Sequence, residues 1–246
     1  MKFEDYSRTF LHFHTAEIPP LLRRHISSGR QGLLDLGAGD GNLLVSLKMS
    51  GLLDSFGKVV AVELSEERCE RLRRYTNFPV IRADATNLAE FAPSSFDFVL
   101  CTQVIEHVDE KKLLNEISRV LKPGGTAYIA SIIKKKHGWW YYRTADGRWA
   151  IDPTHLREYA SVGEYESVIK NGGFEIVETV TAPLRLSVIE FLLRRIVVPV
   201  FKPGDMHGFF IHHPAADWLR KNFNIHPPGY HVVETVAKKQ TRPGLN

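Results

Sequence analysis

A glycine-rich turn between an apolar run and a helical pattern constrains this chain more than any other feature. Residues 33–36 form the apolar run, which contains one acid, Asp35, and Gly37, Gly39 and Gly41 follow at alternate positions. A buried strand, a tight turn and a helix start in this order are typical of the first βα unit of a doubly wound sheet. Glycine suits a backbone that turns through positive φ or passes close to a ligand. The turn therefore predicts a cofactor site at the carboxyl end of the first strand.

Two common cofactor turns do not fit this stretch. The dinucleotide fingerprint has its third glycine where Asn42 stands, and the Gly-Lys-Ser/Thr of a Walker loop is absent. Asp35 followed by Gly-x-Gly-x-Gly resembles motif I of the class I S-adenosylmethionine (SAM)-dependent methyltransferases. The resemblance implies that Asp35, Gly37, Ala38 and Gly39 bind the methionine side of SAM. For the turn taken alone, a nicotinamide enzyme and a purely structural turn remain alternatives.

The next two predicted strands also end in acids. One ends at Glu63 and Leu64, and the other ends at Asp84 and Ala85. A carboxylate at such a strand end can accept hydrogen bonds from both hydroxyls of a ribose. In the resembling family, the acid of the third strand binds the adenine amino group and the following N–H reaches a ring nitrogen. The resemblance thus implies that these four residues bind SAM, whereas an Asx-type turn is the ligand-free interpretation of Asp84.

A further block extends the resemblance to the small-molecule branch of these methyltransferases, the type 11 or quinone-biosynthesis-like enzymes. In that branch "Phe-Asp-x-Val … Glu-His-Val … Leu-Lys-Pro-Gly-Gly" recurs, and this pattern is present within residues 95–131. It implies that Gln103 and Val104 line the floor of the cofactor site. The resemblance covers roughly residues 32–131 and, more weakly, residues 152–180.

The resemblance also implies the fold. We expect an α/β, Rossmann-like, seven-stranded and mostly parallel sheet of order 3-2-1-4-5-7-6, with helices on both faces and the last strand antiparallel. The whole of residues 1–246 is then one methyltransferase domain with three added segments. These are a helical lead-in at 1–30, an active-site lid at 133–160 and a substrate or partner insertion at 183–228 between strands six and seven. The expected strands are 33–36, 58–64, 79–85, 95–102, 126–131, 174–180 and 229–238.

Two histidines are the candidates for catalysis. His155 stands in a stretch that resembles the His-x-Arg-x-Phe/Tyr signature of the same branch, which borders the active site there. We expect it to act as a general base or to orient the substrate, and a structurally bonded histidine is the alternative. His107 follows Glu106, and a comparable Glu-x-x-Glu-His segment can hold a divalent metal in quinone-pathway O-methyltransferases. Since Gln103 replaces the first glutamate and is a weaker ligand for a hard cation, we expect no metal.

Two segments bear on the partner. Residues 134–143 mix lysines with aromatic residues, which favours a lid but also fits nucleic-acid binding or a solvated loop. Residues 186–199 are apolar with two arginines. They favour a helix packed on its own protein, with an apolar pocket wall, a homodimer interface or a peripheral membrane contact as alternatives. His207, His212 and His213 match no known metal signature.

Composition sets the remaining expectations. The 32 basic and 28 acidic residues give a net charge of +4, which permits an anionic partner without requiring one. Cys69 and Cys101 supply no disulfide framework and indicate a reducing compartment. The first residues lack the apolar core of a signal peptide, and no apolar run approaches the roughly 20 residues that span a bilayer. We therefore expect a cytoplasmic protein without a transmembrane segment.

Taken together, the motifs predict a SAM-dependent methyltransferase that methylates oxygen, nitrogen or carbon of a small molecule by positioning it for in-line displacement. One alternative is an RNA methyltransferase that acts on tRNA and binds it through the basic aromatic segment 134–143. The other is a SAM-binding scaffold without catalysis. The Asn/Asp-Pro-Pro-Tyr tetrapeptide used on bases and exocyclic amines is missing, which counts against RNA. A nicotinamide oxidoreductase is the weakest alternative, because no Tyr-x-x-x-Lys follows the glycine turn.

Overall fold

The computed structural model describes residues 16–26, 32–140, 142–144, 146–192, 210 and 212–240. Within these residues, a seven-stranded sheet forms the centre of the molecule. The main strands are β1 Gly32–Leu36, β2 Lys58–Glu63, β3 Val80–Arg82, β4 Phe96–Thr102, β5 Leu121–Lys134, β8 Phe174–Pro183 and β11 Tyr230–Lys239. Their order is β3-β2-β1-β4-β5-β11-β8, and β11 is antiparallel to both of its neighbours. This confirms the expected fold and strand order.

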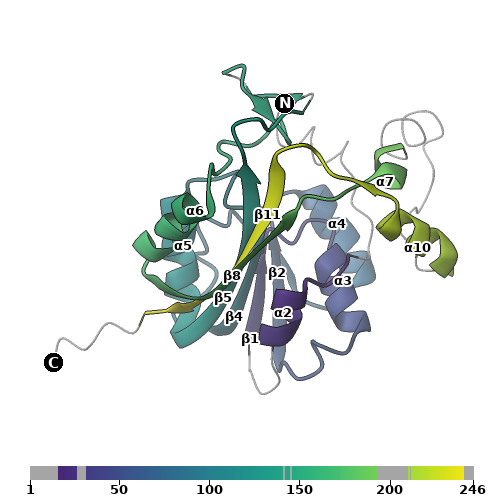
Figure 1. Cartoon of the computed structure of the whole chain (residues 1–246). Helices are drawn as coiled ribbons and strands as arrows, with labels where there is room; N and C mark the ends of the chain where they lie inside the picture. Colours follow the sequence, from purple (N-terminus) through teal and green to yellow (C-terminus); the bar gives the residue numbers. More distant parts are fainter. Residues whose placement is uncertain are drawn as a thin grey trace.

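Helices cover both faces of the sheet (Figure 1). They are α2 Pro20–His25, α3 Asn42–Met49, α4 Glu66–Tyr75, α5 Glu110–Val120, α6 Val162–Asn171, α7 Val188–Leu192 and α10 Pro214–Asn222. Figure 1 shows α2, α3 and α4 on one face, α5 and α6 on the other, and α7 and α10 at one side of the molecule. No described helix has the length and apolar character that crossing a bilayer requires.

The buried strands explain why each face needs a layer of helices. All five residues of β1 are buried, as is typical of a parallel strand covered on both sides. Leu34 and Leu36 pack with side chains of α5 and α6, whereas Leu33 packs with side chains of α2, α3 and α4. Burying each such leucine stabilises the fold by about 1.5–3 kcal/mol. The two apolar layers hold the carboxyl ends of the parallel strands at one edge.

Polar side chains define where several helices begin. The Ser65 hydroxyl accepts a hydrogen bond from the Arg68 N–H at the start of α4. Asp109 accepts from the N–H groups of Lys111 and Lys112 at the start of α5. Such caps satisfy N–H groups that have no partner inside the helix. Because α4 and α5 follow β2 and β4, the caps fix the chain directly beside the strand ends.

β3 and β5 differ most in length from the prediction. β3 stops at Arg82 rather than continuing to residue 85, because Asp84 accepts hydrogen bonds from the N–H and hydroxyl of Thr86 and turns the chain away. β5 begins at Leu121, where a Lys-Pro-Gly-Gly turn was expected. The register against β4 shifts there, from Phe96 opposite Leu121 to Phe98 opposite Thr126. The predicted turn is therefore an irregularity within a longer strand.

The three added segments contain smaller elements. The expected lid carries a hairpin of β6 Tyr142–Arg143 and β7 Trp149–Ala150, and it follows the carboxyl end of β5. The expected insertion carries α7, α10 and the strand pair β9 Leu186–Ser187 and β10 Asn224–Ile225. Of the helix predicted at 186–199, the structure describes only α7, and residues 193–199 lie outside the described residues. So do His207 and most of the lead-in, residues 1–15 and 27–31.

Candidate functional site

The glycine turn after β1 adopts a conformation that other residues rarely reach. Gly37, Gly39 and Gly41 have φ of 67°, 59° and 85°, in the region that glycine adopts without strain. A Cβ on Gly37 would lie 2.4 Å from Cγ2 of Val104, whereas a Cβ on Gly39 would meet nothing within 4 Å. Gly37 thus permits a close approach of two loops, and Gly39 faces open space. The open space beside Gly39 is compatible with the cofactor site predicted at this turn.

Glu63 connects the end of β2 to this turn. Its Oε2 accepts a hydrogen bond from the Gly39 N–H, and its Oε1 accepts one from the Ser65 N–H, both at 2.9 Å. The side chain is almost fully buried, at 3% exposure. An ionised carboxylate has about four lone-pair sites, so Glu63 can still accept hydrogen bonds from the two hydroxyls of a ribose.

Asp35 is a buried carboxyl group with an unmet hydrogen-bonding capacity. Its Oδ1 has no hydrogen-bond partner among the described residues. Burial, together with the negative charge of Glu63, raises the pKa of Asp35 to about 8. An orphaned buried polar atom of this kind indicates that a donor is missing. The ammonium of the SAM methionine group would supply both a donor and an opposite charge, so the residues present fit this cofactor.

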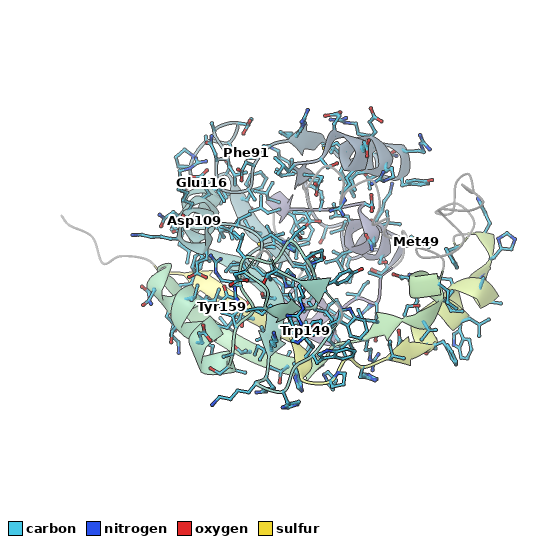
Figure 2. The ribbon with its side chains drawn as sticks, turned by 90° about the horizontal axis from the view of Figure 1, so that it is seen from above. Met49, Phe91, Asp109, Glu116, Trp149 and Tyr159 are labelled. Atoms are coloured by element: carbon cyan, nitrogen blue, oxygen red, sulfur yellow. The ribbon has the colours of Figure 1, made fainter. Side chains whose placement is uncertain are left out.

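A cavity of about 740 Å³ opens at the carboxyl ends of the strands. Figure 2 looks onto this edge of the molecule from above, where Trp149 of the β6–β7 hairpin is labelled. The cavity is lined by every site residue predicted from the sequence. These are Asp35, Gly37, Ala38, Gly39, Glu63, Leu64, Asp84, Ala85, Gln103, Val104, His107 and His155.

At the predicted adenine end of the cavity, Asp84 forms an Asx turn and also has a carboxylate oxygen that could bind a ligand. Oδ1 of Asp84 accepts two hydrogen bonds from Thr86, both at 2.8 Å. The Asx turn is therefore formed, but a carboxylate has a second oxygen that can serve a ligand. Leu64, 46% exposed, is an apolar side chain at the same end of the cavity. The turn and an adenine contact are thus compatible.

The loop after β4 supplies the floor. Gln103 is one of two non-glycine residues with positive φ in the described chain, at 56°, and its N–H donates to the carbonyl of Ala130 at 3.0 Å. Backbone strain of this kind clusters at functional sites. The bend brings Val104 against Gly37 and directs the chain toward Glu106 and His107.

His107 is held by the segment that precedes α6. Its Nδ1 lies 3.0 Å from Oγ1 of Thr154, and that hydroxyl lies 2.6 Å from Oδ1 of Asp152. Since a carboxylate can only accept, the hydroxyl proton goes to Asp152, and Thr154 Oγ1 accepts from the His107 Nδ1–H. This assignment leaves the lone pair of His107 on Nε2. Burial and the nearby charge of His155 lower the pKa of His107 to about 4.

His155 occupies a more strongly charged environment. It is 7% exposed, its Nδ1 lies 3.0 Å from Oε1 of Glu158, and its ring packs edge-on against His107 at 4.7 Å between centroids. Burial opposes its charged form, but the hydrogen bond with Glu158 and the charges of Glu106 and Asp152 outweigh burial and raise the pKa of His155. The pKa of His107 is therefore lowered and that of His155 is raised, so His155 takes up a proton more readily than His107 does.

Glu106 lies beneath this histidine pair. It is fully buried, its Oε2 accepts a hydrogen bond from the Ser131 hydroxyl at 3.0 Å, and its Oε1 has no hydrogen-bond partner among the described residues. Burial raises the pKa of Glu106 to about 7, and the charge of His155 opposes this rise. Ligand atoms of Glu106, His107 and His155 lie within 4.8 Å of one another. These three residues could hold a metal ion, and the cluster does not include Gln103. The expectation that no metal binds therefore stays a prediction.

Segment 134–143 does not present its residues on one surface. Lys134 turns inward, where its ammonium bonds the carbonyl of Trp149 and lies 3.7 Å from Glu158. Trp140 is buried and lines the cavity, and Arg143 stacks on Trp149 at 3.7 Å. Lys135, Lys136 and Trp139 stay exposed, whereas Tyr141 lies outside the described residues. The inward residues support the prediction of a lid more than that of a continuous nucleic-acid surface.

Sequence reasoning missed several polar residues of the cavity wall. Thr154 and Asp152 stand in Asp-Pro-Thr, a turn-forming pattern that would have signalled a local carboxylate–hydroxyl bond. Glu158 lies three residues beyond His155 in a non-helical segment, and nothing in its spacing indicates an ion pair. Tyr128 and Glu234 lie within predicted strands, and no local pattern distinguishes a cavity-lining strand residue from one in the core.

Comparison with known proteins agrees with this arrangement. The profile of a family described as the methyltransferase domain matches residues 34–129. The ubiquinone biosynthesis O-methyltransferase of Methylococcus capsulatus is 30% identical over 115 residues, which cover 45% of this chain and 47% of that protein. The demethylmenaquinone methyltransferase of Leptospira interrogans is 34% identical over 120 residues, covering 46% and 47%. The chain thus spans about half the length of the curated relatives it matches.

Solved structures show the same fold at low identity. A SAM-dependent methyltransferase from Methanosarcina mazei has a TM-score of 0.61 at 14% identity, covering 92% of this chain and 100% of that chain. The [4+2]-cyclase SpnF has a TM-score of 0.60 at 17% identity, covering 90% and 79%. Since the fold is shared with a protein named as a cyclase, the chemistry must be argued from the site.

Proposed function

Residues 34–129 of this chain belong to the class I SAM-dependent methyltransferases, and from that premise we propose that the protein methylates a hydroxyl group of a small-molecule acceptor. One observation carries the proposal. A single cavity is lined by the glycine turn, by acids at or just beyond the carboxyl ends of β1, β2 and β3, and by two histidines whose pKa values are shifted in opposite directions. The donor end and the acid–base end of the proposed site therefore share one cavity.

At the donor end, each predicted residue has a distinct task. Asp35 offers its orphaned oxygen to the ammonium of the methionine group, and Glu63 accepts from the ribose hydroxyls. Asp84 and Ala85 bind the adenine, with Leu64 packed on it. Gly37, Ala38 and Gly39 shape the turn, and Gln103 and Val104 form the floor. SAM supplies a methyl group already activated on a sulfonium, so the protein needs chiefly to position the acceptor, which can contribute up to about 7–11 kcal/mol.

At the acceptor end, His107 is the proposed general base. Its depressed pKa keeps it neutral at physiological pH, and its Nδ1–H is committed to Thr154. The Nε2 lone pair is then available to take the proton of an acceptor hydroxyl. His155, which is bonded to Glu158 and has a raised pKa, packs edge-on against the His107 ring and orients it.

The acceptor is proposed to be largely apolar. Ile132, Trp140, Ile151, Leu184 and Leu186 line the part of the cavity away from the glycine turn. They come from β5, from the expected lid and from the expected insertion, so both added segments shape the acceptor space. The names of the ubiquinone and demethylmenaquinone relatives support an apolar acceptor but do not identify it.

Transfer of a labelled methyl group tests the proposal. The protein is incubated with methyl-labelled SAM and either an extract of small metabolites or total tRNA. We expect label in a small molecule that resists alkaline ester hydrolysis, as a methyl ether does. Label found only in tRNA would replace the proposal with the RNA alternative, and no transfer by protein that binds SAM would favour the scaffold alternative.

A further inference from the structure

The patch that residues 128–132 of β5 and 232–236 of β11 share on one face of the sheet carries a single charged side chain. The register of β5 and β11 pairs Ala130 with Glu234 and Tyr128 with Val236, so these side chains share a face. Ile132 and Val232, the next pair on that face, are apolar. Tyr128, Ala130 and Val236 belong to the apolar cluster beneath α2 and α3. Glu234 thus introduces a carboxylate into an otherwise uncharged patch of these two strands, and it lines the cavity.

No basic side chain among the described residues forms an ion pair with Glu234. Two other carboxylates of the same cavity, Glu17 and Glu190, do have one. Glu17 lies 3.2 Å from Arg185, and Glu190 binds Arg220. Glu234 is only partly exposed, and burial together with the charge of Glu17 raises its pKa. A half-buried carboxylate is stabilised by an opposite charge, so the cavity offers a place for a cation.

Tyr128 supplies an independent observation at the same place. Its side chain is fully buried, it lines the cavity, and its hydroxyl has no hydrogen-bond partner among the described residues. Tyr128 and Glu234 are diagonal neighbours across β5 and β11, within reach of long side chains. Burial raises the pKa of Tyr128, and the neighbouring carboxylate of Glu234 raises it further. A buried phenol beside a carboxylate offers an ammonium both a hydrogen-bond acceptor and an aromatic ring.

We propose that Glu234 and Tyr128 form a subsite that binds an ammonium group of the methyl acceptor, at the end of the cavity away from the glycine turn. The inference rests on the proposed function, because it names a chemical feature of the acceptor in the same cavity. The acceptor is then an apolar molecule with two polar ends, a hydroxyl directed at His107 and an ammonium held by Glu234.

The position of Glu234 argues against the ammonium of SAM as the occupant. Asp35 on β1 pairs with Leu100 on β4, which pairs with Tyr128 on β5. Glu234 lies one strand further, on β11. Three strand spacings correspond to about 14 Å, so one ammonium cannot contact both Asp35 and Glu234. Since Asp35 is beside the glycine turn, the cofactor ammonium belongs there.

Calorimetry with two matched phenols tests the subsite. Tyramine and 4-propylphenol share the phenol ring and differ at the chain end, where an ammonium replaces a methyl group. Each is titrated into full-length protein saturated with S-adenosylhomocysteine. We expect tyramine to bind about tenfold or more tightly than 4-propylphenol, and Glu234→Gln to reduce this preference to less than about twofold.

A second carboxylate of the same cavity serves as the control. Glu17→Gln removes a charge that is already paired with Arg185, and it should leave the tyramine preference within about twofold of wild type. Equal binding of the two phenols, or no binding of either, would overturn the subsite. So would a variant Glu234→Gln that keeps the preference.

Titration of S-adenosylhomocysteine into the same variant distinguishes the ammonium of the acceptor from the ammonium of the cofactor. If Glu234→Gln weakens S-adenosylhomocysteine as much as it weakens tyramine, the group held is that of the cofactor and the inference is wrong. If Glu234→Gln does not fold, Tyr128→Phe provides the test, with an expected loss of about threefold in preference; an unchanged preference contradicts the inference. Should wild-type protein not bind S-adenosylhomocysteine at all, the proposed function fails instead.

Discussion

Nδ1 of His107 lies 3.0 Å from the hydroxyl oxygen of Thr154, a residue 47 positions later in the chain. Through this contact, the segment before α6 sets which ring nitrogen of His107 carries a proton. Thr154 is itself oriented by Asp152, which accepts from its hydroxyl and from its N–H. The candidate base is therefore positioned by a part of the chain outside the strands that form the donor end.

Replacing Thr154 tests this positioning. Thr154→Val keeps the shape of the side chain and removes the oxygen that accepts from His107. We expect kcat to fall by about tenfold or more, within the range that a general base contributes, while the affinity for SAM stays the same. Steady-state kinetics and calorimetry measure the two quantities. Thr144→Val is the control, since that hydroxyl bonds Asp146 within the β6–β7 hairpin. An unchanged kcat for Thr154→Val would show that the hydrogen bond between His107 and Thr154 does not contribute to catalysis.

The ionised form of Asp35 should destabilise the ligand-free protein and at the same time favour cofactor binding. Its pKa is raised from 3.8 to about 8, so the folded state holds a proton that the unfolded state has lost. The resulting stabilisation is fully present below about pH 4 and is lost as pH rises toward about 8, on the order of a few kcal/mol in all.

The substitution Asp35→Asn removes the loss of stability that ionisation of Asp35 causes as pH rises. We expect it to raise the melting temperature of ligand-free protein at about pH 8 but not at about pH 4. It should also weaken S-adenosylhomocysteine by about tenfold or more, because a neutral amide cannot pair with the ammonium. Thermal melts and calorimetry test the two effects. Equal destabilisation by Asp35→Asn at both pH values would contradict the assigned pKa.

Chelation tests the expectation that no metal is used. Glu106, His107 and His155 come within 4.8 Å of one another, but Nδ1 of His155 is already bonded to Glu158 and the raised pKa of His155 favours its protonated form. A protonated imidazole cannot bind a metal. Activity should therefore survive dialysis against EDTA and should not rise on addition of Mg²⁺ or Zn²⁺. A loss with EDTA that either ion restores would show that these three residues are ligands.

The sequence predicted which residues line the cavity beside the glycine turn, because the requirements of that turn are local. Gly37 and Gly39 stand where the backbone has positive φ, and this need is visible in a strand–turn–helix pattern. Glu63 follows a strand whose apolar run is clear, so its place beside the glycine turn follows from the order of parallel strands. The early end of β3 was missed, because the Asx turn of Asp84 competes with strand pairing.

The acceptor end could not be predicted in the same way. The contact of His107 with Thr154 joins two loops and depends on how the segment before α6 returns to β4. Glu234 reaches Tyr128 only because β11 runs antiparallel to β5 in one register. A shift of one residue would send the carboxylate to the opposite face. Such long-range registers leave no periodic signal in the residues themselves.

Calorimetric titration of S-adenosylhomocysteine tests whether the cavity beside the glycine turn binds the cofactor. We expect a saturable heat with wild-type protein and an affinity weaker by about tenfold or more in Glu63→Ala. Glu66→Ala, one residue into α4 and paired with Arg73 at the surface, should bind like wild type. Circular dichroism establishes that both variants are folded. The absence of binding to folded wild-type protein, or equal affinity in Glu63→Ala, would contradict the account.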